Sequence, residues 1–376
     1  MIVSASEHIE AARRLLGARP GRGRRARTRL GQAVDAGVLR VMQRIFVASH
    51  RKNERRSGGV RGLAGEWREL ATAAAADPRV AFPGPTPPAG LVVNHRRQLE
   101  GGWVEDLCFP GVHAPGRVSA ADLLRRYPEN ATAHARHLRH EDSHRPGLIW
   151  IHGWGMGNYR LESRVLGARL LFQRGLDVYL YVQPYHAARM PAGVRFAGTM
   201  HPSTRITRTN EAFLQTAWEV RSLAARHRAL TGGPCGVMGW SLGGYVCAML
   251  ASVAPELAFV IAMMPMADVP ALLWSWGEGT ADRARAEAAG VTFDEFCESM
   301  AIHAPLAHRL ALPVERVLLI GAEGDRIIPP LHTHALHAHW GRPRLHWFPG
   351  SHVVHFGRRG YRDAAVGFLR GLGLLT

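Results

Sequence analysis

From residue 147 to the end of the chain, short continuous runs of hydrophobic residues alternate with longer segments of helical periodicity. Continuous apolar runs of this length predict buried strands, and they lie at 147–153, 176–182, 235–240, 257–264, 315–323 and 344–350. The segments between them predict helices, which lie at 163–175, 207–230, 242–255, 330–341 and 359–372. Repeated strand–helix units indicate a parallel sheet that is covered by helices on both faces.

A different pattern precedes this region. The segment 91–110, LVVNHRRQLEGGWVEDLCFP, predicts two short strands around a Gly-Gly turn, an antiparallel opening to the larger sheet. Residues 71–90 pass from alanine-rich to proline-rich sequence, which indicates a connector without regular structure. A chain of 376 residues suits one large α/β domain with extensions. We therefore expect a basic helical extension at 1–70, a connector at 71–90 and an α/β domain at 91–376.

The charge of the chain is concentrated at its N-terminus. The formal net charge is +17, and residues 1–60 hold fourteen Arg or Lys residues against four acidic ones. Within this stretch a helix is predicted whose apolar positions share one face, namely Val34, Val38, Met42, Ile45 and Phe46. We expect this basic amphipathic helix to pack on the α/β domain, with attachment to an anionic membrane surface as the alternative. No motif that reads nucleic acid is present, so we expect no nucleic-acid partner.

Two further features indicate the cellular compartment in which the protein is expected. No apolar run approaches the length of a membrane span, and the first residues lack the order of a secretory signal. The four cysteines are far apart without a C-x-x-C pair, so neither a disulfide framework nor a zinc knuckle is indicated. We expect a cytoplasmic protein, peripheral at the membrane if the basic helix is a membrane arm.

The most specific motif is GVMGWSLGGYV at residues 236–246. Gly239, Ser241 and Gly243 form G-x-S-x-G between a predicted strand and a predicted helix, the context that gives this motif meaning. A nucleophilic serine in such a turn sits on a strained backbone, and glycines two residues before and after it allow the close approach of neighbouring chain. We therefore interpret Ser241 as a nucleophile.

A serine hydroxyl needs a base, and the base needs an acid that holds its tautomer. Asp325 follows the predicted strand 315–323, and His352 follows the strand 344–350, so both belong to loops at the edge where strand ends converge. Asp268, after the preceding strand, is the alternative for the acid, and His355 is the alternative for the base.

The loop HGWGMGN at 152–158 has the form of an oxyanion-binding loop, because its glycines, Gly153 among them, let backbone amides turn inward. We expect the donors to be the amides of Trp154 and of Leu242, the residue after the nucleophile. The loop matches neither phosphate-binding glycine motif, so no nucleotide cofactor is expected.

With these motifs the chain resembles an α/β-hydrolase from about residue 90 to the C-terminus. The matching pieces are HGWGMG as oxyanion loop, GWSLGG as nucleophile turn, GDRIIP as acid loop and GSH around the histidine. The resemblance implies a mostly parallel eight-stranded sheet and cofactor-free hydrolysis of an ester or related bond. QPYHAARMP at 183–191 also resembles the P-Y-x-x-R-x-P stretch of a lipase-like branch. In that case Arg189 would anchor an acidic group of the substrate; a structural arginine is the alternative.

Residues 269–312 fall between two predicted strands at the usual place of a lid. Trp240, Trp274 and Trp276 are expected to face the substrate, which favours an apolar acyl group. The histidine-rich patches at 134–144 and 332–340 lack a specific ligand template, so surface histidines are expected there and no metal site.

Together these features predict a serine hydrolase that cleaves a carboxylic ester or thioester, small molecule or lipid, through Ser241, His352 and Asp325. The alternatives are an acyltransferase that uses the same residues and a non-catalytic binding protein with the same fold.

Overall fold

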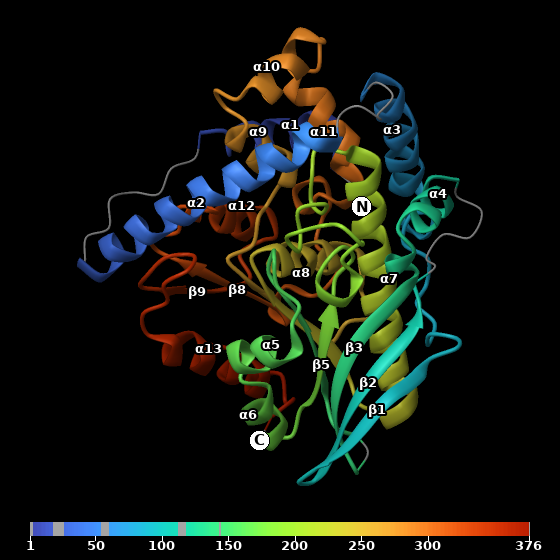
Figure 1. The fold of residues 1–376 in the computed structure, drawn as a ribbon. Helices are drawn as coiled ribbons and strands as arrows, with labels where there is room; N and C mark the ends of the chain where they lie inside the picture. Colours follow the sequence, from blue (N-terminus) through green and yellow to red (C-terminus); the bar gives the residue numbers. More distant parts are fainter. Residues whose placement is uncertain (1–2, 18–25, 54–59, 112–117, 143, 376) are drawn as a thin grey trace.

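The computed structural model describes residues 3–17, 26–53, 60–111, 118–142 and 144–375. Their centre is one mixed sheet of nine strands in the order β1-β2-β3-β5-β4-β6-β7-β8-β9 (Figure 1). The strands are β1 Val92–Leu99, β2 Gly102–Pro110, β3 Thr132–His140, β4 Gly147–Ile151, β5 Asp177–Val182, β6 Cys235–Trp240, β7 Val260–Met263, β8 Val317–Ala322 and β9 Arg344–Phe348. From β5 to β9 all neighbours are parallel, whereas β1, β2, β3 and β5 pair antiparallel.

The sheet has one strand more than the eight that the sequence predicts. The additional strand is β3, which occupies one of the two stretches interpreted as surface histidines. From Thr132 to His137 its residues alternate between half-buried and buried, and Ala133 and Ala135 are buried. His137 and His140 of β3 are buried, as is His332 in the other patch, so the expectation of surface histidines is wrong at these three positions.

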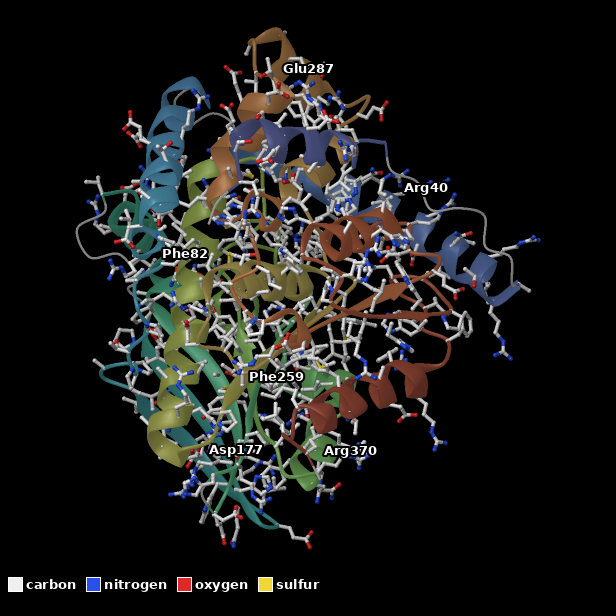
Figure 2. The ribbon with its side chains drawn as sticks, turned by 180° about the vertical axis from the view of Figure 1, so that it is seen from behind. Arg40, Phe82, Asp177, Phe259, Glu287 and Arg370 are labelled. Atoms are coloured by element: carbon white, nitrogen blue, oxygen red, sulfur yellow. The ribbon has the colours of Figure 1, made fainter. Side chains whose placement is uncertain are left out.

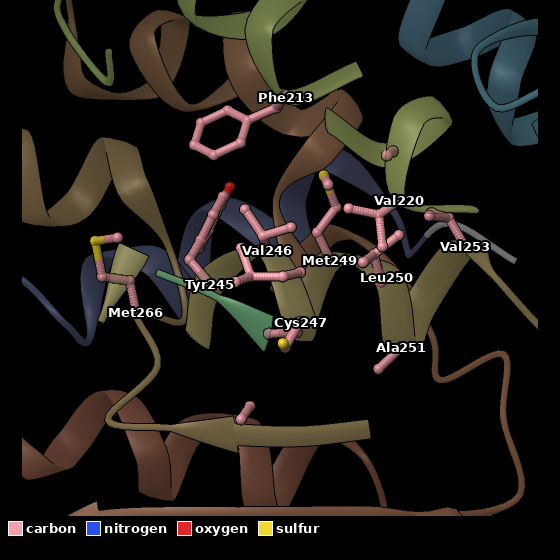
Figure 3. Packing of buried hydrophobic residues seen from close by; sticks show 14 of the residues in the cluster. Phe213, Val220, Tyr245, Val246, Cys247, Met249, Leu250, Ala251, Val253 and Met266 are labelled. Carbon is pink, nitrogen blue, oxygen red and sulfur yellow. The ribbon is translucent and has the colours of Figure 1, made fainter. Parts of the chain in front are cut away.

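Helices cover both faces of the sheet. On one face lie α7 Ile206–Thr231, α8 Leu242–Val253 and α12 Pro330–His339, and on the other α5 Tyr159–Leu166, α6 Ala168–Gln173 and α13 Arg358–Gly371. Strand β4 shows that both faces of the sheet are buried under apolar side chains. Ile149 and Ile151 belong to one hydrophobic cluster, and Leu148 and Trp150 belong to the other. Figure 3 shows part of the first cluster, where apolar side chains of α8 lie near Phe213 and Val220 of α7.

The remaining helices lie around one end of this core. They are α1 Ala5–Arg13, α2 Ala26–Asn53, α3 Val60–Ala76, α4 Val118–Arg126, α9 Val269–Trp276, α10 Ala281–Ala288 and α11 Phe293–Met300. Short 3₁₀ helices lie at Pro78–Val80, Pro128–Ala131, Ala187–Arg189, Ala301–His303, Pro305–Ala307 and Val314–Arg316. Helices α9, α10 and α11 occupy the segment predicted as a lid.

The N-terminal helices pack on the rest of the molecule. In α1, His8 contacts Asp268 at 2.7 Å and Arg13 pairs with Asp294 at 2.5 Å. In α3, the buried Trp67 donates a hydrogen bond to Thr207. Helix α2 crosses the molecule beside the loops that follow β8 and β9 (Figure 1).

The buried face of α2 agrees with the predicted one only in part, because Val38, Met42 and Ile45 are half-buried as expected but Val34 is exposed. Its fully buried positions are polar or small, namely Thr28, Gly31, Gln32 and Asp35, followed by the half-buried Val38 and Met42. Val34 is 37% exposed, because the helix is rotated so that Asp35 faces the protein. The Phe46 side chain and residues 18–25 and 54–59 of the predicted extension lie outside the described residues.

No helix among the described residues combines the length and the apolar content that crossing a bilayer requires.

Candidate active site

Ser241 stands in the turn between β6 and α8, with a backbone φ of +57° that non-glycine residues rarely adopt. The turn is tight enough to require its glycines. A Cβ at Gly239 would lie 2.6 Å from the carbonyl oxygen of Gly243, and a Cβ at Gly243 would overlap the carbonyl of Ile151. The strained turn therefore presents the Ser241 hydroxyl at the carboxyl end of the parallel strands.

The structure brings together the three residues predicted to act with each other. His352 Nε2 lies 2.9 Å from Ser241 Oγ, and His352 Nδ1 lies 2.7 Å from Asp325 Oδ2. The second carboxylate oxygen, Asp325 Oδ1, accepts the amides of Ile327 and Ile328 at 2.9 and 2.7 Å. With Asp325 ionised, Nδ1 carries the proton and donates it, so Nε2 offers a lone pair to the serine hydroxyl.

A fourth residue, Asp35 of α2, supports this arrangement and was not predicted. Its carboxylate is fully buried and accepts four hydrogen bonds of 2.8–3.1 Å. The donors are the Ser351 hydroxyl and the backbone amides of His352, Val353 and Arg326. Asp35 thus joins the histidine loop to the acid loop. One feature of the sequence could have drawn attention to Asp35, because it is the only acidic residue between Glu10 and Glu54.

The charge of Asp35 also acts on His352. Burial alone would lower the pKa of His352, but the charge of Asp325, its hydrogen bond and the nearby charge of Asp35 raise that pKa above its ordinary value. Helix α2 comes this close because residue 31 is glycine: a Cβ there would lie 2.9 Å from Ser351 Cβ.

The two alternative residues are engaged elsewhere. Asp268 Oδ1 accepts the amide of Ala271 at 2.8 Å and so caps α9, while Oδ2 contacts His8. His355 Nε2 lies 2.9 Å from the carbonyl of His352, and its ring stacks edge-on against Trp240. Among the described residues, the geometry therefore favours Asp325 as the acid and His352 as the base.

This assignment predicts different outcomes for two carboxylates. Asp325→Asn is expected to lower kcat by about 10⁴-fold, because the amide would hold the wrong tautomer of His352. Asp268→Asn is expected to keep most activity, since asparagine also caps helices well. Steady-state hydrolysis by both variants, each checked by thermal unfolding, measures the difference. A larger loss in Asp268→Asn would reverse the assignment.

The predicted oxyanion loop is rigidly held. His152 is buried, and burial lowers its pKa to about 3, so the ring is neutral. Its Nδ1–H donates to the Gly153 carbonyl at 2.8 Å, and its Nε2 accepts the amide of Gln183 at 3.1 Å. Trp154 and Leu242 line the same pocket as Ser241, and Leu242 opens α8, where first-turn amides lack partners within the helix.

Ser241 lines an apolar pocket that is partly open to solvent. Among the described residues that line it, Ser241 is the one polar residue; they are Met42, Trp154, Pro202, Ser241, Leu242, Met266, Val269, Leu272, Leu273, Trp276, Ile327 and Ile328. The pocket therefore draws residues from α2, from the predicted lid helix α9 and from the acid loop.

Of the residues predicted to bind substrate, Trp276 alone lines this pocket. Trp240 packs against Trp150 and His355, and Trp274 packs against aromatic residues of α11. Arg189 is fully buried, and its guanidinium pairs with Glu219 at 2.6 and 2.9 Å. The prediction that Arg189 anchors substrate is therefore corrected: it is a structural arginine, because its charge is already neutralised inside the protein.

Solved structures share this architecture. Acetyl xylan esterase 1 from Thermoanaerobacterium sp. JW/SL YS485 matches with a TM-score of 0.50 at 16% identity, over 84% of this chain and 99% of the esterase. Acetyl xylan esterase from Paenibacillus sp. R4 matches with a TM-score of 0.50 at 14% identity, over 82% and 94%. The chain has the α/β-hydrolase fold. At these identities the likeness to the esterases establishes this fold and nothing further.

No protein-family model matches this α/β-hydrolase-fold chain. Two uncharacterized proteins of Mycobacterium tuberculosis, from strains CDC 1551 / Oshkosh and H37Rv, are each 30% identical to it over 268 residues. These matches cover 69% of this chain, and they span 62% of the length of the relatives.

Proposed function

We propose that this protein is a serine hydrolase that cleaves carboxylic esters or thioesters with an apolar acyl group. One observation carries the proposal: the continuous contact from Asp325 through His352 to the Ser241 hydroxyl, at the wall of an apolar pocket. Serine, histidine and aspartate in this geometry form the arrangement that activates a serine for acyl transfer.

In the proposed reaction, Ser241 Oγ attacks the acyl carbonyl while His352 Nε2 takes the hydroxyl proton. Asp325 stabilises the resulting imidazolium, and the amides of Trp154 and Leu242 donate to the oxyanion. His352 then returns the proton to the leaving alcohol or thiol as its bond to the carbonyl breaks. Water attacks the acyl-enzyme through the same base, which releases the acid and restores Ser241.

The apolar pocket gives the proposal its substrate class. An acyl chain that fills the pocket removes apolar surface from water, worth about 0.8 kcal/mol for each methylene group. A sugar or a charged peptide would lose hydration there without gaining polar partners. We therefore expect kcat/KM to rise with acyl length until the pocket is full.

Trp276 tests the role of this pocket. In Trp276→Ala, kcat/KM for a p-nitrophenyl ester that fills the pocket is expected to fall by about tenfold or more, with little change for the acetate. The matched control is Trp274→Ala on the same helix, because Trp274 is absent from the pocket lining. Equal losses on short and long esters in both variants would show that the pocket does not bind the acyl group.

A further inference from the structure

A second group of titratable side chains lies at the opposite end of the sheet from Ser241. Asp177 begins β5, and the parallel register places Asp177 and Cys235 level with Gly147, whereas Ser241 follows the other end of β6. Figure 2 shows Asp177 near the far end of the molecule from Arg40 of α2. Two histidines approach Oδ2 of this aspartate, His137 from β3 and His227 from α7.

The three side chains form a buried, closely spaced set. Each has 0% exposure, and their ligand atoms lie within 4.8 Å of one another. His137 Nε2 is 3.5 Å from Asp177 Oδ2, and His227 Nδ1 is 4.0 Å from the same oxygen. Both ring nitrogens of His137 and Asp177 Oδ2 lack a hydrogen-bond partner among the described residues. Buried polar atoms are rarely left in this state.

Surrounding contacts orient lone pairs toward the centre of the set. His227 Nε2 lies 2.9 Å from the Arg145 carbonyl, so it carries the proton and leaves Nδ1 as an acceptor. The Tyr179 hydroxyl lies 3.3 Å from that Nδ1. Asp177 Oδ1 is held by the amide and the ring of His140, both at 2.8 Å, which leaves Oδ2 for the centre.

The other ring nitrogen of His137 also faces an acidic group, because Nδ1 lies 3.8 Å from the Glu105 carboxylate. A carboxylate or carbonyl behind each histidine is the usual support for a metal-bound imidazole. A cation between His137 Nε2 and Asp177 Oδ2 would give both atoms the partner that they otherwise lack among the described residues.

The spacing also differs from that of three other histidine–aspartate pairs among the described residues. His140–Asp177, His352–Asp325 and His8–Asp268 all close to 2.7–2.8 Å. Ligand atoms around a tetrahedral zinc with bonds of about 2.0–2.2 Å lie about 3.3–3.6 Å apart. The 3.5 Å separation falls in this range, and the 4.0 Å separation is slightly wider.

We propose that His137, Asp177 and His227 bind one divalent transition-metal ion, with Zn²⁺ as the best match to two imidazoles and one carboxylate. The ion joins β3, β5 and α7, and therefore fastens the antiparallel part of the sheet to the parallel part. Its distance from Ser241 makes the site structural, and the inference is independent of the proposed hydrolase function.

The test is metal binding by the full chain. Protein stripped with chelator under denaturing conditions is refolded with or without Zn²⁺ or Co²⁺, and bound metal is measured by elemental analysis. We expect one equivalent per chain, visible ligand-field absorption from Co²⁺, and a thermal midpoint raised by about 5 °C or more with excess Zn²⁺. His137→Asn and His227→Asn should each abolish the cobalt absorption.

His95→Gln, an exposed histidine on β1 of the same sheet, is the matched control and should bind metal as the wild type does. Folded wild-type protein that takes up no metal would overturn the proposal, and so would unchanged stoichiometry in the two variants. The set would then be a protonated His137 between the carboxylates of Glu105 and Asp177. The metal content of the wild-type protein tests the proposal even if the two variants fail to fold.

Discussion

Replacing Ser241 by alanine is expected to lower kcat for ester hydrolysis by about 10⁴–10⁶-fold, because the attacking atom itself is removed. The fold should persist, since the side chain lost is small and the strained backbone at φ +57° is common to both residues. Hydrolysis of an ester that fills the pocket, together with thermal unfolding of both proteins, measures the two effects separately.

Ser252→Ala is the control for this prediction. Ser252 lies at the far end of the same helix, α8, where its hydroxyl contacts the carbonyl of Ala248 at 3.4 Å. Its variant should keep wild-type kcat. Substantial turnover by the Ser241→Ala protein would mean that another group attacks the substrate, and the proposed mechanism would be wrong.

Asp35→Asn is the second change with a large expected effect, although Asp35 is remote in sequence from every predicted catalytic residue. The amide can accept hydrogen bonds at only one of its two positions, so one or more donors of the two loops must lose their partner. The resulting shift of His352 is expected to lower kcat by on the order of 100-fold.

The pH profile separates positioning by Asp35 from a merely structural role. In the proposed reaction neutral His352 is the active form, so kcat/KM is expected to rise with pH through the pKa of this histidine. The charge of Asp35 is one of the causes that raise that pKa. Removing the charge lowers it, so the acid limb of the profile should move to lower pH in Asp35→Asn, and kcat should fall more than KM changes.

Glu10→Gln provides the comparison, because Glu10 is an exposed acid on α1 whose ion pair with Arg14 is a surface contact. It should leave both kcat and the pH profile unchanged. An Asp35→Asn protein that melts earlier but keeps its kcat and its acid limb would show that Asp35 only stabilises the fold.

Asp35 also changes how the basic N-terminus can be studied. Deleting residues 1–60 would remove Asp35 and Met42 together with the arginines, so lost activity would not report on a membrane arm. Substituting exposed arginines of α2, such as Arg40 and Arg44, tests vesicle binding without touching the loops. Reduced binding to anionic vesicles at unchanged kcat would support the membrane-arm proposal, and unchanged binding would oppose it.

The sequence predicted which three side chains contact one another because each belongs to a local signal. Ser241 lies in a motif whose glycines are required by the turn, and Asp325 and His352 each follow an apolar strand. Parallel strands of one sheet bring such loops to one edge, so chain order alone implied their proximity. Their contacts in the structure follow from this topology.

What the sequence did not predict depends on contacts between distant segments. Asp35 and Ser351 are 316 residues apart, and no periodicity relates them. The apolar positions of helix α2 predicted part of its buried face, including Val38 and Met42, but not Asp35, which is buried because donors of two loops need an acceptor. Strand β3 was missed because histidines replaced the apolar residues that mark a strand, although burial of His137 is balanced by acidic neighbours.

The central claim is an activated serine, and intact-mass analysis after treatment with a fluorophosphonate probe tests it most directly. We expect one adduct per chain on the wild-type protein, no adduct on Ser241→Ala, and strongly slowed labelling of His352→Ala. Absence of labelling on folded wild-type protein, or equal labelling of the Ser241→Ala variant, would contradict the proposed serine hydrolase.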